Sequence, residues 1–277
     1  MKKILSLGLT AVLSLSLLAG CAPKAETPSN SNTEAPAQAV EITIGVSPEP
    51  HSKLVSLVID DLEKEGIKVN LIEFTDYVKP NLSLADGEID ANFFQHKPYL
   101  DDFIAKEKLD LVSIGNVHVE PMALYANGVD SLEDLPEGAE IAIPNDTVNG
   151  GRALLLLEAN GLIKLNEGAG LEATEKDIAK NPKNIKFTAL EAAMLPRVLA
   201  QIDGAVINGN YALEAGLNPV EDGIVIEGKD SPYANIVAVR AGEEKEDKFV
   251  KLIKALQSDE VKAYIEENYD GGVVPAF

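Results

Sequence analysis

The 277-residue sequence predicts an α/β protein whose body is divided into two lobes. From Glu41 onward, short strand-like apolar runs alternate with amphipathic helical segments, which favours mostly parallel sheets covered by helices on both faces. A loop at 128–138, rich in turn residues, then begins a second series of such units that ends near residue 229. One α/β series inserted into another predicts two lobes with a ligand cleft between them. A single large sheet remains the alternative that this pattern leaves open.

The first series begins with a strand over 42–46, and a helix follows in which apolar residues recur at helical spacing from Leu54 to Leu62. Gly66 suits the left-handed residue that ends such a helix. Further strands, with one short helical turn at 82–87, are expected at 67–74, 89–94, 111–119 and 122–126.

The second series has strands at 141–144, 185–190 and 205–208, and a helix at 153–160 that Gly161 ends. A strand at 236–240 and helices at 245–257 and 259–268 close the chain. We therefore expect lobe 1 to comprise residues 41–127 and 231–277, and lobe 2 to comprise residues 128–230.

The N-terminus has the form of a secretion signal. Lys2 and Lys3 precede an apolar run over 4–18, which is shorter than the ~20 residues that a membrane span requires. The run ends in Leu18-Ala19-Gly20-Cys21, which resembles the lipobox of bacterial lipoproteins. Residues 1–20 are thus expected to be removed, and Cys21 to be lipidated and to anchor the protein outside the cytoplasm. The alternative is a plain secretory signal that happens to end in cysteine.

After Cys21 the sequence to residue 40 is rich in Ala, Pro, Ser, Asn and Thr and has almost no large apolar side chain. Such a segment cannot bury enough apolar surface to offset the entropy of ordering. We expect it to be a disordered tether between the anchor and the body.

Composition excludes several classes of partner and chemistry. With 24 Lys+Arg against 45 Asp+Glu, the net charge of −21 opposes binding to nucleic acid or to anionic lipid headgroups. The chain lacks a phosphate-binding loop, a His-Glu-x-x-His zinc helix and a Gly-x-Ser-x-Gly nucleophile elbow. His51, His96 and His118 have no metal-ligand spacing. We therefore expect no catalytic residues, no metal, no cofactor and no enzymatic activity.

One candidate binding segment is Pro144–Arg152, which immediately precedes the apolar run from Ala153. Its two adjacent glycines allow close approach of another group to the backbone. An arginine in a first helical turn opposes the helix dipole, so Arg152 should have an anionic partner. That partner is either a ligand carboxylate or a structural acid such as Asp146.

Two further segments carry polar or aromatic side chains at strand ends. In Asp90–Tyr99, Phe93 and Phe94 point to opposite faces of a strand, so only one of them can line a cleft. Asn208 ends the strand over 205–208, where its amide could accept a hydrogen bond from an ammonium group or could cap the next helix.

Taken in order, seven segments resemble the methionine-binding lipoproteins of bacterial ABC importers, the NlpA lipoprotein family. They are the lipobox, 74–81, 90–101, 144–152, 190–197, 205–208 and 231–235. The resemblance covers residues 41–277. Members of the family differ in whether they bind L-methionine, D-methionine or methionine-containing dipeptides.

The resemblance implies a two-lobed periplasmic-binding-protein-like fold of type II and the function of a lipid-anchored, extracytoplasmic substrate-binding protein. Such a protein would capture methionine between its lobes and deliver it to an ABC permease with its ATPase. A methionine-containing dipeptide or another small amino acid is the alternative ligand. A surface-interaction lipoprotein and an extracellular hydrolase are the rival functions.

The resemblance also implies residue roles. The ligand carboxylate would bind Arg152, and its polar ends would bind Asn149 and Asn208. The thioether would be walled by aromatic rings, with which sulfur makes favourable contacts, namely those of Tyr77, Phe94, His96 and Tyr125. Tyr77 and Tyr125 could instead be ordinary core or surface aromatics. Local departures from the family pattern leave the exact ligand open; they are Phe93, Glu120 and Gly209–Asn210.

Overall fold

The computed structural model describes residues 40–228 and 231–277. The predicted signal peptide, Cys21 and the predicted tether up to residue 39 lie outside these residues. None of the helices in the described ranges is long and apolar enough to span a membrane.

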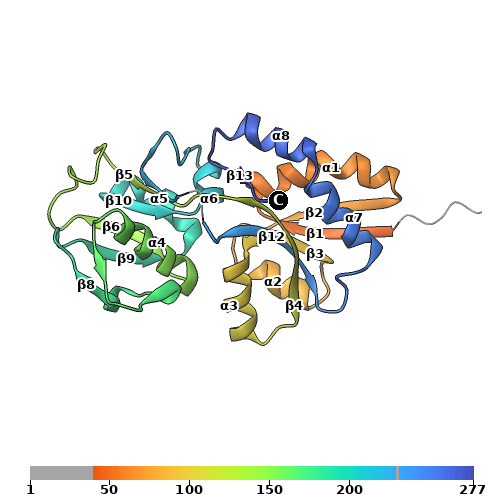
Figure 1. The fold of residues 1–277 in the computed structure, drawn as a ribbon, viewed down its shortest axis with the longest axis horizontal. Coiled ribbons are helices and arrows are strands. Elements are labelled where there is room, and N and C mark those ends of the chain that lie inside the picture. Colours follow the sequence, from red (N-terminus) through yellow and green to blue (C-terminus); the bar gives the residue numbers. More distant parts are fainter. Residues whose placement is uncertain (1–39, 229–230) are drawn as a thin grey trace, which may run out of the picture. The chain divides into compact units, whose positions relative to one another are not determined.

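Two main sheets organise the body (Figure 1). The first sheet has six strands in the order β13-β4-β12-β3-β1-β2, and the second has five in the order β11-β5-β10-β6-β9. The predicted two-lobed α/β architecture is therefore confirmed, and the single-sheet alternative is wrong. The strands of the first sheet are β1 (Val40–Val46), β2 (Ile67–Glu73), β3 (Ala91–His96), β4 (Leu111–Val119), β12 (Ala234–Arg240) and β13 (Val274–Pro275).

The second sheet contains β5 (Ala123–Ala126), β6 (Glu140–Pro144), β9 (Lys186–Leu190), β10 (Gly204–Ile207) and β11 (Gly223–Ile226). The chain crosses to it between β4 and β5, and returns between β11 and β12. Strand β5 was expected in lobe 1, whose first part was placed at 41–127, so that boundary is too late. The cause is local: only Glu120–Met122 separate β4 from β5, and no turn-rich loop marks the crossing.

Parallel pairing is confined to one end of each sheet, where β1 pairs with β2 and β3, and β6 pairs with β9 and β10. The other neighbours are antiparallel. Antiparallel pairs are thus more frequent than strand–helix alternation predicts, since the strands beside the two crossings run against their neighbours.

Helices cover both faces of the first sheet. On one face, α1 (Lys53–Lys64), α7 (Asp247–Leu256) and α8 (Asp259–Asn268) enclose the largest core cluster with β1 and β3. Helices α2 (Lys79–Ala85) and α3 (Lys97–Glu107) cover the other face. A kinked turn, η1 (Pro48–Ser52), in which Glu49 has an extended backbone, leads into α1, and Gly66 has the expected left-handed φ of 80° after that helix.

The second sheet has α4 (Thr147–Ala159) on one face and α5 (Leu195–Val198) with α6 (Gly209–Glu214) on the other. A two-stranded sheet of β7 (Lys164–Leu165) and β8 (Ile178–Lys180) is separate. Short 3-10 turns complete this part of the chain at η2 (Gly170–Glu172), η3 (Glu175–Asp177), η4 (Ala192–Met194) and η5 (Leu199–Gln201).

Helix α4 begins six residues earlier than its apolar run predicts. Asp146 caps it by accepting the Asn149 N–H at 2.9 Å, so Arg152 lies in the second turn rather than the first. The two glycines serve packing: a Cβ at Gly151 would lie 2.1 Å from the carbonyl oxygen of Leu171 in η2. The close approach that was expected is therefore made by the chain's own backbone.

Candidate ligand-binding site

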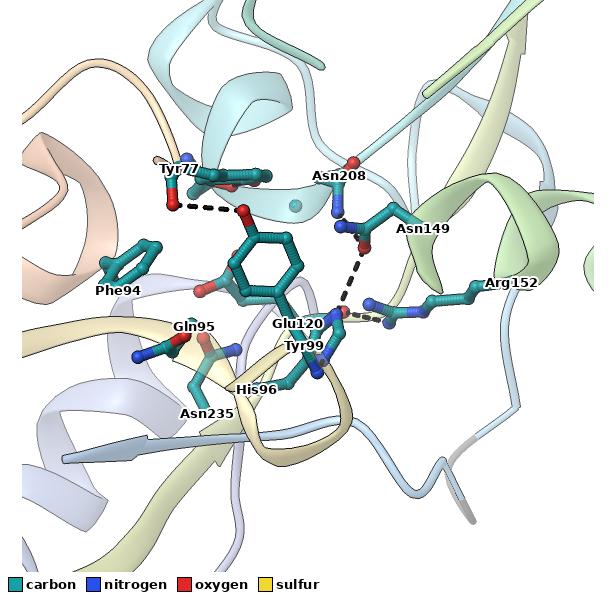
Figure 2. Close-up of a pocket in the computed structure, with 12 residues that line it drawn as sticks. Tyr77, Phe94, Gln95, His96, Tyr99, Glu120, Asn149, Arg152, Asn208 and Asn235 are labelled. Atoms are coloured by element: carbon teal, nitrogen blue, oxygen red, sulfur yellow. Dashed lines mark hydrogen bonds between the residues drawn. The ribbon is translucent and has the colours of Figure 1, made fainter. Parts of the chain in front are cut away.

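A small pocket lies where the carboxyl ends of β3 and β10 meet, and its empty space of about 330 Å³ includes the part that is open to solvent (Figure 2). The first sheet and its loops supply the aromatic rings, and polar side chains come both from these segments and from α4 and the start of α6. The lining residues are Tyr77, Phe94, Gln95, His96, Tyr99, Glu120, Asn149, Arg152, Asn208, Gly209, Asn210 and Asn235.

Three rings form the apolar wall of the pocket. The centroid of the Tyr77 ring is 6.0 Å from that of Phe94 and 5.8 Å from that of Tyr99. Tyr99 Oη donates to the Tyr77 carbonyl at 3.0 Å, which fixes the two rings together (Figure 2). Phe93 is fully buried in the core and packs edge-on against the His51 ring, with 4.6 Å between the two ring centroids. The prediction that only one of the two adjacent phenylalanines lines the cleft is confirmed, and that residue is Phe94.

A buried amide network supports this wall from behind. Asn81 Nδ2 donates to Gln95 Oε1 at 2.8 Å, and Gln95 Nε2 donates to Asn81 Oδ1 at 2.7 Å. Asn92 Nδ2 donates to the same Asn81 oxygen at 2.8 Å. Because buried amides must be satisfied, this reciprocal pairing fixes how α2 sits against β3.

His96 and Asn149 join the two sides of the pocket. The Nδ1 atom of His96 accepts the Tyr99 N–H at 3.2 Å, so we assign the ring proton to Nε2, which donates to Asn149 Oδ1 at 3.1 Å. Asn208 Nδ2 donates to the same oxygen at 2.8 Å, and Asn149 Nδ2 donates to Asp146 at 3.0 Å. Burial and then the charge of Arg152 lower the pKa of His96 to about 3, so the ring is neutral near pH 7.

Arg152 has a structural acid as its partner, and that acid is Glu227 rather than Asp146. Its Nε and Nη2 donate to the two Glu227 oxygens at 2.9 and 2.5 Å, and Nη2 also donates to the Glu120 carbonyl at 2.9 Å. The guanidinium carbon lies 4.2 Å from the centroid of the Tyr233 ring. The two N–H groups of Nη1 make no hydrogen bond to the described residues, so Arg152 keeps donors for a second anion.

Two buried polar atoms in the pocket have no hydrogen-bond partner within residues 40–228 and 231–277. They are Asn208 Oδ1, an acceptor, and Asn210 Nδ2, a donor. Asn208 is the N-cap residue of α6, but its side chain makes no capping bond. The helix-cap interpretation is therefore right for its position and wrong for its side chain. Unpaired buried polar atoms are costly, which points to a ligand that satisfies them.

Glu120 and two histidines converge beside the pocket, although they are distant in sequence. His118 Nε2 lies 2.7 Å from Glu120 Oε1, and His51 Nε2 lies 3.4 Å from the same oxygen and 3.2 Å from Asn235 Oδ1. Burial lowers the pKa of His51 to about 4 and that of His118 to about 3. It raises the pKa of Glu120, while the charge that His51 carries only when protonated, the Asn210 backbone N–H and the charge of Arg152 act to lower it.

Tyr125 does not line the pocket. It lies on β5 and packs on the α5 and α6 face of the second sheet with Ala142, Leu195 and Ala205. The alternative that Tyr125 is a core aromatic is correct. Among the residues that line the pocket, Tyr99 of α3 supplies a ring where Tyr125 was expected to do so.

Six predicted ligand residues do line one pocket: Tyr77, Phe94, His96, Asn149, Arg152 and Asn208. The sequence analysis assigned no ligand role to the other lining residues, although it marked Glu120 and Gly209–Asn210 as departures from the family pattern. These residues are Gln95, Tyr99, Glu120, Gly209, Asn210 and Asn235. Tyr99 and Asn210 each lie within three residues of a predicted one, so extending each strand-end motif into the following helix would have found them.

Comparisons with known proteins show which family this chain resembles. The sequence profile of the NlpA lipoprotein family matches residues 42–277. The D-methionine-binding lipoprotein MetQ of Salmonella typhimurium is 49% identical over 214 residues, which are 76% of this chain and 79% of that protein.

Two solved structures are also similar to this chain. A nutrient-binding protein from Burkholderia cenocepacia bound to methionine superposes with a TM-score of 0.82 at 47% identity, covering 85% of this chain and 100% of that chain. A periplasmic substrate-binding protein of an ABC transporter from Coxiella burnetii has a TM-score of 0.81 at 43% identity, with the same coverage. With its family profile matched over nearly the whole described body, the chain belongs to the NlpA lipoprotein family.

Proposed function

We propose that this protein is the substrate-binding component of an ABC importer and that it captures methionine between its two lobes. The carrying observation is the chemistry of the pocket, which combines three aromatic rings with a buried acceptor, Asn208 Oδ1, that has no hydrogen-bond partner in the described residues. The related proteins that bind methionine support the choice of ligand. No bond is made or broken in this function.

In the pose that we propose, the polar end of methionine lies between α4 and the start of α6. Its carboxylate accepts from Arg152 Nη1 and Asn210 Nδ2, and its ammonium group donates to Asn208 Oδ1. The thioether lies among Tyr77, Phe94 and Tyr99, where sulfur–aromatic contacts contribute roughly 0.3–1.5 kcal/mol each.

His96 and Asn149 have a positioning role in this pose. The hydrogen bonds of His96 and of the Asn149 amide are already made with protein groups, so neither offers a free polar atom to the ligand. The proposal thus differs from the family-based expectation, in which Asn149 binds a polar end of the ligand.

Binding would couple the ligand to the arrangement of the lobes. The rings belong to elements of the first sheet, whereas Arg152, Asn208 and Asn210 belong to elements of the second. A ligand that contacts both groups stabilises the arrangement in which they face each other. We propose that the permease and its ATPase recognise this arrangement, and that lipidated Cys21 and the tether keep the protein at the outer face of the membrane.

A methionine-containing dipeptide is the second candidate ligand, because a neighbouring cavity adjoins the pocket. This cavity is open to solvent and shares Tyr77 and Tyr99 with the pocket. It is lined by the carboxylates of Asp76, Asp146 and Glu191, which could receive an additional amino-terminal residue.

Calorimetry on protein shown by native mass spectrometry to be free of copurified ligand tests the proposal. L-methionine, D-methionine and Gly-Met are titrated separately, with norleucine as the control that replaces sulfur by a methylene. We expect saturable heat for methionine and weaker binding of norleucine. Absence of both heat and a thermal shift at millimolar methionine would overturn the assignment. A Cys21→Ser variant, expected to leave the membrane fraction, tests the anchor separately.

A further inference from the structure

A buried polar cluster adjoins the pocket and has no role in the pose described above. We define the His51–Glu120–His118 cluster as these three side chains, which come from η1, the residue after β4, and β4 itself. Both histidines are fully buried and Glu120 is 5% exposed, yet Glu120 also lines the pocket. The cluster therefore connects the core of the first lobe to the ligand space.

The positions of the ring protons follow from the contacts. Neither Nδ1 atom has a hydrogen-bond partner in the described part of the chain, whereas both Nε2 atoms face acceptors. Because an unpaired buried N–H is rarer than an unpaired acceptor, we assign each proton to Nε2. His118 then donates to Glu120 Oε1, and His51 donates between that oxygen and Asn235 Oδ1. These two donors and the Asn210 backbone N–H favour the ionised form of the carboxylate.

Glu120 lacks a permanent cation. Arg152 contacts its backbone carbonyl and pairs with Glu227 instead, and no Lys or Arg in the described ranges forms a salt bridge with the Glu120 carboxylate. A buried charge is stable only when it is paired and hydrogen-bonded. The neutral histidines supply hydrogen bonds but no opposite charge, so a cation is the group that the site still requires.

We propose that the His51–Glu120–His118 cluster makes the pocket select ligands that carry a protonated amino group. Glu120 supplies the fixed anion and His118 is a positioning residue that holds it. This inference rests on the proposed function, because it places the ammonium group of an amino acid between Glu120 and the unpartnered Asn208 Oδ1. The inference thus assigns the specificity for amines to the Glu120 carboxylate.

Packing holds the carboxylate in place. A Cβ at Gly209 would lie 2.6 Å from Glu120 Cβ and 3.1 Å from Oε2, so the start of α6 is seated directly against this side chain. Arg152 Nη2 fixes the Glu120 carbonyl at 2.9 Å. Glu120 therefore has little freedom to turn away from the pocket.

The sign of the pH dependence follows from the groups around Glu120. Both histidines remain neutral above pH 5, given their pKa values of about 4 and about 3. Burial raises the pKa of Glu120, so an amine ligand should bind more weakly as pH falls through that pKa, since the carboxyl group must then lose its proton. The ionisable groups that face Glu120 are His51, His118, Arg152, Tyr77, Glu214 and Tyr269.

Calorimetry with two ligands tests the inference. L-methionine is compared with 4-(methylthio)butanoate, which lacks only the amino group, at pH 5.0 and pH 7.5. We expect the wild type to bind methionine at least 30-fold more tightly, and Glu120→Gln to lose most of this ratio by weakening methionine alone. His118→Phe should reduce the ratio about tenfold, and His118→Gln, which keeps an N–H near Nε2, should restore it.

The outcomes separate the two proposals. Wild-type protein that binds neither ligand contradicts the proposed function. If the wild type binds methionine and 4-(methylthio)butanoate with similar affinity, the present inference is overturned without measuring any variant. An unchanged ratio in folded Glu120→Gln overturns it as well. A final titration adds zinc chloride to the ligand-free protein. Saturable zinc binding that His118→Phe abolishes would make the cluster a metal site and overturn the proposal, whereas absence of saturable zinc binding supports it.

Discussion

Replacing Arg152 by alanine separates the two anions that we assign to this residue. Its side chain is 4% exposed, and it makes three hydrogen bonds to Glu227 and to the Glu120 carbonyl, leaving Nη1 for a ligand carboxylate. Truncating one partner of a buried, hydrogen-bonded charge pair costs about 2–5 kcal/mol. At 1.4 kcal/mol per factor of ten, Arg152→Ala should raise the Kd for methionine by about 30- to 4,000-fold.

Glu227→Gln is the matched control. It removes the charge of the structural partner but leaves Nη1 unchanged, so we expect the Kd to stay within fivefold of the wild type. Both variants should lower the Tm, because each leaves one buried partner without its opposite charge. Calorimetry gives the Kd and thermal denaturation the Tm. Folded Arg152→Ala that binds methionine within fivefold of the wild type would refute a direct contact between Arg152 and the carboxylate.

Three further variants test the packing and the protonation argument. Gly151→Ala places a Cβ 2.1 Å from the Leu171 carbonyl oxygen. Although alanine favours helices elsewhere, this clash should lower the unfolding free energy, measured by urea denaturation, by about 1–3 kcal/mol. A higher unfolding free energy in the variant would contradict the close packing. Tyr125→Phe removes a hydroxyl that lies outside the pocket and has no hydrogen-bond partner in the described residues. Calorimetry should therefore show an unchanged Kd for methionine, and urea denaturation should show no loss of stability. In the folded protein the pKa values of His51 and His118 are about 4 and about 3, whereas in the unfolded chain they are near 6.5. As pH falls from 6.5 towards the folded values, the unfolded chain therefore binds more protons, and the unfolding free energy should fall by about 1.4 kcal/mol per pH unit for each histidine. His118→Phe should reduce this slope by the contribution of one histidine.

Local sequence patterns predicted the elements whose ends are set by local chemistry. The expected ranges of β4 and α8 agree with the structure to the residue, since apolar runs and polar flanks mark their limits. The start of α4 was misplaced because Gly150 and Gly151 look like helix breakers in sequence. Their conformation is helical. Glycine is needed at 151 because the backbone of η2, from a later part of the chain, lies where a Cβ would be.

The site shows the same division between local and distant information. Strand-end residues such as Phe94 and Asn208 were found because parallel strands present their carboxyl ends to a common cleft. The wrong role of Tyr125 follows from the boundary error at β5: once that strand belongs to the second sheet, the side chain faces its α5 and α6 side. The convergence of His51 with Glu120 depends on tertiary packing, for which no spacing along the chain gives a signal.

The polarity of the pocket is determined by a chain of hydrogen bonds that starts at a helix cap. Asp146 offers only acceptors when ionised, so Asn149 must present its NH₂ group to it and its oxygen to the other side. That oxygen accepts from His96 and from Asn208 Nδ2, which leaves Asn208 Oδ1 as the atom directed at the ligand space. Turning the Asn208 amide would place two oxygens together and lose the bond to Asn149. The cap of α4 thus fixes an unpaired acceptor in a pocket that Glu120 also lines, and a donor such as the ammonium group of the proposed ligand would satisfy that acceptor.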